Sequence, residues 1–136
     1  VQKKVSFYDV KKTWVVEDLQ DLVGIIKSAL KNNNIGILNK YKAKINFFSK
    51  YWRQKDYDKS ISERVFNIGS FLFKSRVHYS QELESDSNAN EAYLKTWGWH
   101  YFVNTWYFYF RRIDFSPDPE VDGKWEWAGI YFGTKN

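Results

Sequence analysis

Residues 97–115 read WGWHYFVNTWYFYFRRIDF, and ten of these nineteen residues are Trp, Tyr or Phe. Successive side chains of a strand point to opposite faces, so the pattern predicts one long strand with aromatic rings on both faces. Such a strand is stable only when both faces are covered, or when one face lines a pocket or an interface. This segment is therefore the first place to look for function.

One face of this strand is the candidate ligand-binding face. His100 and Asn104 are polar groups among aromatic neighbours, so they could orient a bound ligand. The alternative is a satisfied core or edge histidine, which is the commoner fate of a polar group on an apolar face. The residues predicted to bind a ligand on this face and on the last strand are His100, Phe102, Asn104, Trp106, Phe108, Phe110, Arg112, Trp125 and Trp127.

The other face of the same segment is rich in Trp and Tyr. It carries Trp97, Trp99, Tyr101, Tyr107 and Tyr109, and it ends in Arg111. Exposed rings in a row would form a platform for sugars or unstacked bases. Burial in the core or in a dimer interface is favoured, because monomers rarely expose large aromatic patches. Arg111 and Arg112 point to opposite faces, and pairing with a carboxylate such as Asp114 is favoured over a role in anion binding.

The N-terminal part of the chain has helical periodicity. Apolar residues at helical spacing predict a helix over residues 17–31, with acidic side chains in its first turn. A short second helix is predicted over residues 35–41, with Asn34 as its cap. The period then changes to two, which predicts a strand over residues 41–47, followed by a loop over residues 51–59. Ser60 and Glu63 form a capping box before a further helix over residues 61–73.

The C-terminal part is predicted to be mostly strand. Residues 77–79 are predicted to form a short strand, and the acidic segment 81–91 is expected to be the least ordered loop. Pro117 and Pro119 interrupt the ladder, and Asp122-Gly123 is a hairpin-type turn before a last strand over residues 124–132. On that strand Trp125, Trp127, Gly129 and Tyr131 are predicted to share one face, opposite Glu126, Ala128, Ile130 and Phe132. Helices followed by strands predict one α+β domain over residues 1–136, with the helices packed on a strongly curved antiparallel sheet.

Composition limits the possible chemistry. The chain has 136 residues, a net charge of +5 and no cysteine, which excludes disulfides and thiolate chemistry. No histidine pair has metal-ligand spacing and no phosphate-binding glycine loop occurs, so we predict no metal and no cofactor. The excess positive charge is spread along solvated faces, which disfavours nucleic acid as a partner. No apolar run is long enough to span a membrane, and the absence of Met at position 1 favours a processed extracytoplasmic protein that is secreted, periplasmic or anchored as a lipoprotein.

The order of elements resembles the NTF2-like superfamily, whose cystatin-like fold is a cone-shaped α+β domain. The resemblance rests on the first helix and on residues 106–114 (WYFYFRRID), followed by DGKW at 122–125 and WAGI at 127–130. It implies a bent sheet wrapped around a helix, a hydrophobic pocket at the mouth of the cone, and often a dimer formed through the sheet. Enzymatic members carry an Asp–His or Tyr–Asp set in the cone, and the histidines of this chain, His78 and His100, lack that context.

Three functions follow from these patterns. The first is non-enzymatic binding of an apolar small molecule or a partner through an aromatic pocket or sheet face. The second is a cofactor-free isomerase or dehydratase of the same fold, with His100 or Asp114 in acid–base catalysis. The third is a protein-interaction or immunity-like module, including a homodimer formed through the sheet.

Overall fold

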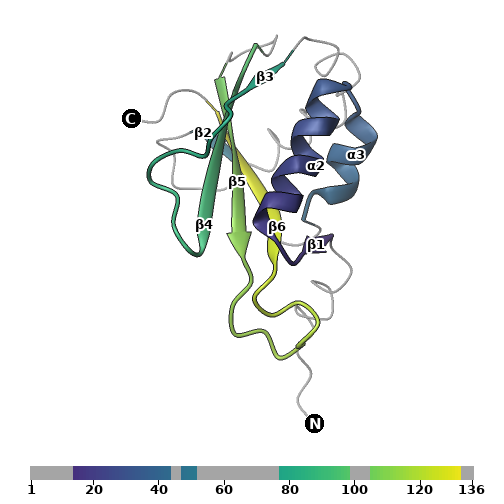
Figure 1. Ribbon diagram of the computed structural model, residues 1–136, viewed down its shortest axis with the longest axis vertical. Coiled ribbons are helices and arrows are strands. Elements are labelled where there is room, and N and C mark those ends of the chain that lie inside the picture. The colour runs from purple at the N-terminus through teal and green to yellow at the C-terminus, as the bar shows by residue number, and fades with distance from the viewer. Residues whose placement is uncertain (1–13, 44–46, 52–76, 99–104, 133–136) are drawn as a thin grey trace.

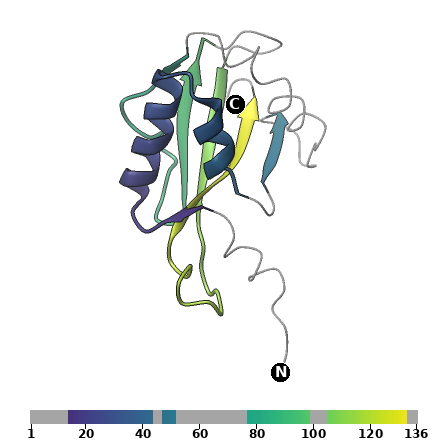
Figure 2. The same cartoon turned by 90° about the vertical axis from the view of Figure 1, so that its right-hand side faces the viewer.

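The computed structural model describes residues 14–43, 47–51, 77–98 and 105–132. Two helices pack against one face of a curved six-stranded sheet, which confirms the predicted α+β class (Figure 1). The strand order is β1-β6-β5-β4-β3, and β2 also pairs with β6. Figure 2, turned by 90°, again shows α2 and α3 on the same side of the sheet. The opposite face, which we call the outer face, is not covered by these helices.

The two N-terminal helices match their sequence signals. Helix α2 (Leu19–Lys31) begins after Asp18, whose carboxylate accepts a hydrogen bond from the backbone N–H of Gln20 at 2.9 Å. Asp18 is thus the cap, so the helix starts two residues later than the predicted 17–31. Helix α3 (Ile35–Tyr41) has the predicted bounds and the predicted cap, because the Asn34 side chain accepts from the N–H of Ile37 at 3.1 Å.

The single long aromatic strand was a wrong prediction. The segment contains the end of β4 (Glu91–Trp97) and all of β5 (Thr105–Arg112), which pair antiparallel from Glu91 opposite Arg111 to Trp97 opposite Thr105. Gly98 has a φ of 89°, a left-handed conformation that glycine adopts without strain, and β4 ends before it. Aromatic residues continue on both sides of this glycine, and that continuity hides the break in the sequence.

The edge of β6 (Trp125–Phe132) that does not pair with β5 pairs with two short strands. Strand β1 (Val15–Val16) pairs antiparallel with its first residues, and β2 (Phe48–Tyr51) pairs parallel with residues 129–132. The strand predicted over residues 41–47 is not found where the structure describes that segment: Tyr41 ends α3, Lys42 makes one isolated bridge to Trp127, and the β2 ladder starts at Phe48. Residues 44–46 lie outside the described residues. Tyr51, predicted as loop, belongs to β2. The helix predicted over residues 61–73 lies outside the described residues.

A β-bulge in β6 exchanges the predicted faces of the residues that follow it. Tyr109 lies opposite Gly129 and Phe110 lies opposite Trp127, so Ala128 is an extra residue in β6. Trp125 and Trp127 therefore share the core face with Ile130, whereas Tyr131 contacts tyrosines of the outer face. Strict alternation had placed Tyr131 with the two tryptophans, and the bulge makes that wrong. The bulge thus places Tyr131 on the outer face together with Tyr93, Tyr107 and Tyr109.

The core lies between the helices and the inner face of β4, β5 and β6. It consists of Leu22, Val23, Ile26, Ala29, Leu30, Leu38, Ala43, Phe47, Ala92, Leu94, Trp106, Phe108, Phe110, Trp125, Trp127 and Ile130. Thr96 is the polar group of this layer, and its hydroxyl donates to the carbonyl of Trp106 at 2.8 Å. The core is built mainly from aromatic rings on the sheet side and aliphatic side chains on the helix side.

The acidic segment after β3 (His78–Tyr79) is not the unstructured loop that the sequence indicated. The Asn88 carboxamide oxygen accepts from the N–H groups of Asn90 and Glu91 at 2.8 and 3.1 Å. The Ser87 hydroxyl accepts from the N–H of Tyr93 at 3.1 Å. These side-chain caps, together with Leu83, which packs against the core, explain how a mostly polar segment takes a defined conformation. Strand β3 itself confirms the short strand predicted over residues 77–79.

Candidate binding surface on the outer sheet face

Four tyrosines gather on the outer face, and we call them the tyrosine patch. They are Tyr93 of β4, Tyr107 and Tyr109 of β5, and Tyr131 of β6. Antiparallel pairing places Tyr93 opposite Tyr109 and Tyr107 opposite Tyr131, so the four side chains form two adjacent rows. The register of three strands, rather than any contiguous motif, assembles the patch.

Three rings of the patch contact one another. Ring centroids are 5.3 Å apart for Tyr93 and Tyr109, and 6.1 Å apart for Tyr131 and each of those two rings. Such tilted and edge-to-face pairs are favourable geometries for aromatic side chains. Tyr107 and Tyr109 are buried, whereas Tyr93 and Tyr131 are half-buried. The patch is thus an ordered, partly exposed layer of rings.

Three phenols of the patch, those of Tyr93, Tyr109 and Tyr131, are held in their neutral form. Burial, followed by the charge of Glu91, raises the pKa of Tyr93 to about 12. Burial also raises the pKa of Tyr109, whose hydroxyl donates to the Glu91 carboxylate at 2.5 Å, and burial raises the pKa of Tyr131. A general base or acid works best with a pKa near the working pH. These phenols are therefore suited to hydrogen bonding and ring contact rather than proton transfer.

A row of three charged residues borders the patch on one side. Glu91, Arg111 and Glu126 lie side by side on β4, β5 and β6. The Glu126 side chain is only 3% exposed, and its Oε2 accepts from Nη2 and Nε of Arg111 at 2.7 and 3.2 Å. Its Oε1 is buried and has no hydrogen-bond partner within the described part of the chain. Burial raises the pKa of Glu126, and the Arg111 guanidinium partly opposes that rise.

The buried carboxylate predicts a pH dependence of stability. A carboxyl whose pKa is raised on folding binds its proton more readily in the native state. Its contribution to stability is therefore fully present below its ordinary pKa of 4.5 and is lost as the pH rises through its pKa in the folded state. In the Glu126→Gln variant, the free energy of unfolding should decrease less as the pH rises. Urea unfolding of both proteins between pH 4 and 8 measures the difference, and equal slopes would contradict the assignment to Glu126.

The opposite end of the patch is positive and partly apolar. Lys95 lies on β4 beside Tyr107, and both Lys95 and Glu91 are half-buried. Trp97 follows on the same face with 36% exposure, and its ring stacks on the exposed His78 with centroids 5.8 Å apart. The outer face therefore runs from an acidic row, across tyrosines, to a lysine and an exposed tryptophan.

The residues predicted to bind a ligand divide into three groups. Trp106, Phe108, Phe110, Trp125 and Trp127 are buried in the core under the helices. Arg112 instead donates from Nε and Nη2 to the Asn90 side chain at 3.3 and 3.2 Å, and its Nη2 lies 3.9 Å from the exposed Asp114. His100, Phe102 and Asn104 lie outside the described residues. The predicted pairing of an arginine with Asp114 is present, and the arginine is Arg112.

Part of the predicted Trp- and Tyr-rich face is present, but residues of two strands form it. Trp97, Tyr107, Tyr109 and Arg111 do lie on one face, although Trp97 comes from β4 and the other three come from β5. Sequence reasoning missed Tyr93, Tyr131 and the two glutamates. The alternation of residues 91–97 was the available signal for β4, because Glu, Tyr, Lys and Trp alternate there with Ala, Leu and Thr.

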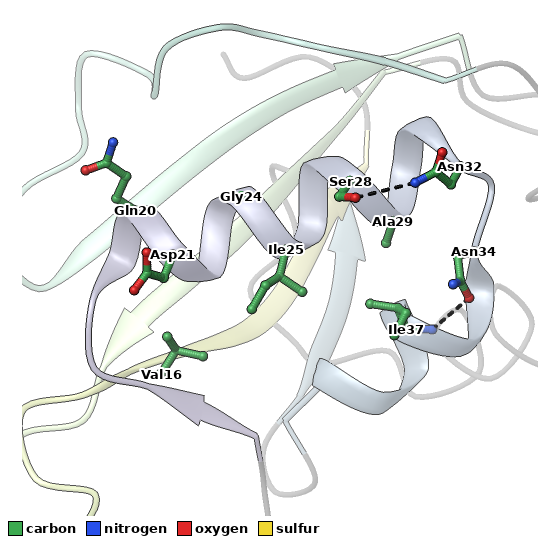
Figure 3. A pocket seen from close by; sticks show the side chains of 10 residues that line it. All are labelled: Val16, Gln20, Asp21, Gly24, Ile25, Ser28, Ala29, Asn32, Asn34 and Ile37. Atoms are coloured by element: carbon green, nitrogen blue, oxygen red, sulfur yellow. Dashed lines mark hydrogen bonds between the residues drawn. The ribbon is translucent and has the colours of Figure 1, made fainter.

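Two shallow grooves flank α2. One has a volume of about 720 Å³ and lies between α2, α3 and β1, with Ile25, Ile37 and Val16 turned towards it (Figure 3). The other, of about 470 Å³, lies between α2 and the segment after β3. Both are lined partly by Gly24, and neither is lined by residues of the tyrosine patch. Of the residues predicted to bind a ligand, those that the structure describes line neither groove.

Metal and membrane sites are not found among the described residues. No group of three or more His, Asp or Glu side chains in that part of the chain is arranged to hold a metal ion. No helix described here has the length and apolar composition needed to cross a bilayer.

Comparison with known proteins leaves the family open. No protein-family model matches the sequence, and no curated protein matches it significantly. Among solved structures, the chain is similar to a proposed ketosteroid isomerase from Shewanella frigidimarina, with a TM-score of 0.47 and 10% identity over 83% of this chain and 92% of that one. This likeness carries no argument about activity, so function is inferred from the residues themselves. The NTF2-like resemblance stays a prediction.

Proposed function

We propose that the protein is a non-enzymatic interaction module that binds a protein partner through the tyrosine patch, and that the partner is a second copy of the chain. The observation that carries this proposal is the cluster of four tyrosines on the sheet face opposite the helices, three of which, Tyr93, Tyr109 and Tyr131, have rings in mutual contact. Tyrosine is enriched in interfaces because it combines a large rigid ring with a hydrogen-bonding hydroxyl. The exposed Trp97 beside the patch extends the apolar contact area.

The charges around the patch fit a two-fold arrangement. Glu91 and Lys95 lie on the same face of β4, four residues apart, which corresponds to about 14 Å along a strand. A two-fold axis in the interface, perpendicular to the strands, reverses the strand direction of the second copy. It places Glu91 of each copy opposite Lys95 of the other and brings the two tyrosine patches together. Sheets packed face to face lie about 10 Å apart, a spacing that tyrosine side chains fill.

A charge-exchange experiment tests this arrangement. Lys95→Glu and Glu91→Lys should each weaken self-association by about tenfold or more, because each places like charges opposite one another twice in a symmetric dimer. An equimolar mixture of the two variants should form a heterodimer, since every contact then joins opposite charges. Sedimentation velocity over a concentration series measures both effects.

The control is Lys31→Glu, which makes the same charge change on an exposed position at the end of α2. It should leave the dimer unchanged. Circular dichroism establishes that each variant is folded, which matters for Glu91→Lys because Glu91 also accepts the Tyr109 hydroxyl. A wild-type chain that remains monomeric at all concentrations would contradict the proposal. If that monomer retains an apolar molecule in native mass spectrometry, ligand binding replaces self-association as the working function.

A further inference from the structure

The groove between α2 and the segment after β3 has an ordered wall on each side. One wall is α2, and the other belongs to the segment 80–84, which follows β3. The N–H of Ser80 donates to the carbonyl of Lys95 at 3.0 Å, and the N–H of Glu84 donates to the carbonyl of Tyr93 at 2.9 Å. These bonds tie both ends of the segment to β4, so the groove is a fixed feature of the fold.

The lining of this groove combines an apolar surface with one positive charge. Its apolar lining residues are Leu19, Val23, Leu83 and Leu94, and all four belong to the core or pack against it. Among the described lining residues, Lys27 is the one that carries a charge. The volume of about 470 Å³ lies within the range of small-molecule sites, which is roughly 300–1,000 Å³. The groove therefore has room for a short apolar chain beside a cation.

Neutral groups hold the Lys27 ammonium in place. Its Nζ donates to the carbonyl of Gln81 at 3.2 Å and lies 5.3 Å from the centroid of the Tyr79 ring. Lys27 is half-buried, and no carboxylate of the described residues forms an ion pair with it. An ammonium has three N–H donors, so the Gln81 carbonyl leaves two of them for an anion. The cation is thus positioned at the groove without a counter-ion from the described part of the chain.

Gly24 leaves space along α2 beside this lining. It occupies an exposed position inside the helix, where glycine is less favourable than any residue except proline. A Cβ at this position would meet no other described part of the chain within 4 Å. Packing among these residues therefore does not require a glycine here, whereas a molecule lying against α2 would benefit from one.

We propose that this groove binds a small apolar carboxylate, such as a medium-chain fatty acid. The carboxylate accepts from the Lys27 ammonium, and the hydrocarbon chain lies against the leucines and Val23. Charge-assisted hydrogen bonding and burial of the chain both favour such a ligand. A dianionic phosphate would keep one charge uncompensated beside the single described cation, which favours a carboxylate. The inference is independent of the proposed self-association, because α2 and the tyrosine patch lie on opposite faces of the sheet.

Three ligands with the same eight-carbon chain test the proposal: octanoate, octanol and octylammonium. The methyl signals of Leu19, Leu83 and Leu94 report on this groove, because no described leucine lines the other one. In NMR titrations of the whole chain at pH 7, below the concentrations at which the ligands aggregate, these signals should shift with octanoate. Octanoate should bind about fivefold tighter than octanol, as expected for a partly exposed ion pair, and octylammonium should bind most weakly.

Substitutions at Lys27 test the role of the cation. Lys27→Met keeps most of the apolar stem, so it should lower the affinity for octanoate to that for octanol. Lys27→Glu should reverse the order, so that octylammonium binds tightest. The matched control is Lys31→Met, which removes an exposed charge from the last turn of the same helix and should leave all three affinities unchanged. Circular dichroism establishes that each variant is folded.

Three results would overturn the proposal. The absence of a saturable shift of the leucine methyls with any of the three ligands would show that the groove is not a binding site. Equal affinities of the unmodified chain for octanoate and octylammonium would remove the cation from the recognition. A preference for octanoate that survives in Lys27→Met would place the carboxylate at another site.

Discussion

Trp127→Ala is expected to destabilise the protein by about 4 kcal/mol, because removal of a fully buried tryptophan leaves a large cavity. Trp127 has no exposed surface and lies at the bulge of β6. Its ring stacks on Phe108 at 4.8 Å and meets Phe47 edge-on at 5.2 Å, and its Nε1 donates to the carbonyl of Gly129 at 3.1 Å. The loss therefore combines ring packing with the hydrogen bond that spans the bulge.

Urea unfolding followed by circular dichroism measures this loss. The matched control is Phe115→Ala, which also removes an aromatic ring but from a 91% exposed position, and it should cost nothing measurable. Trp127→Phe should fall between the two, since it keeps a ring against Phe108 and loses the indole N–H. A cost below about 1 kcal/mol for Trp127→Ala would mean that this ring is not the centre of the core.

Arg111→Met should destabilise the protein by about 3 kcal/mol, although Arg111 is partly exposed. The change leaves Glu126, with 3% of its side chain exposed, as a buried carboxylate without its counter-ion. The pKa of Glu126, already raised by burial, should rise further, so the variant should regain stability as the pH falls. Denaturant unfolding at pH 5 and pH 8 measures both effects.

A second substitution separates the lost pair from other effects. Arg111→Met combined with Glu126→Leu replaces the ion pair by apolar groups and should recover most of the lost stability, because no buried charge remains. The neighbouring Arg112→Met is the control, since Arg112 bonds to the exposed Asn90 and should cost less than about 0.5 kcal/mol. A double variant less stable than Arg111→Met alone would contradict this account.

Both predictions depend on β6, the first through Trp127 on its core face and the second through Glu126, the partner of Arg111, on its outer face. Trp127 and Glu126 are adjacent in β6, yet one contacts the aromatic core and the other the charged row beside the tyrosine patch. The outer face therefore depends on β6 keeping its register. Loss of the bulge would turn Tyr131 away from Tyr93 and Tyr109 and would remove part of the proposed interface.

Local signals in the sequence determined the parts of the fold that depend on neighbouring residues. Helices α2 and α3 follow from apolar spacing and from the caps Asp18 and Asn34, because a helix closes its hydrogen bonds within a few residues. The last strand and the α+β class were also predicted, since alternation and the order of elements are visible along the chain. The aromatic excess correctly indicated a segment with both faces in use.

Tertiary structure alone decided which rings meet. The break at Gly98, the extra residue Ala128 in β6 and the start of β2 at Phe48 all arise from pairing between strands, which a periodic pattern does not specify. A one-residue shift moves every later side chain to the other face, so the bulge took Tyr131 out of its predicted face and completed the tyrosine patch. The exposure of Phe115 likewise depends on a loop fixed by Asp118 and Asp122, whose hydrogen bonds form only once the chain has folded back on itself. The sequence determined the elements, and the register between strands determined the outer face on which the proposed self-association rests.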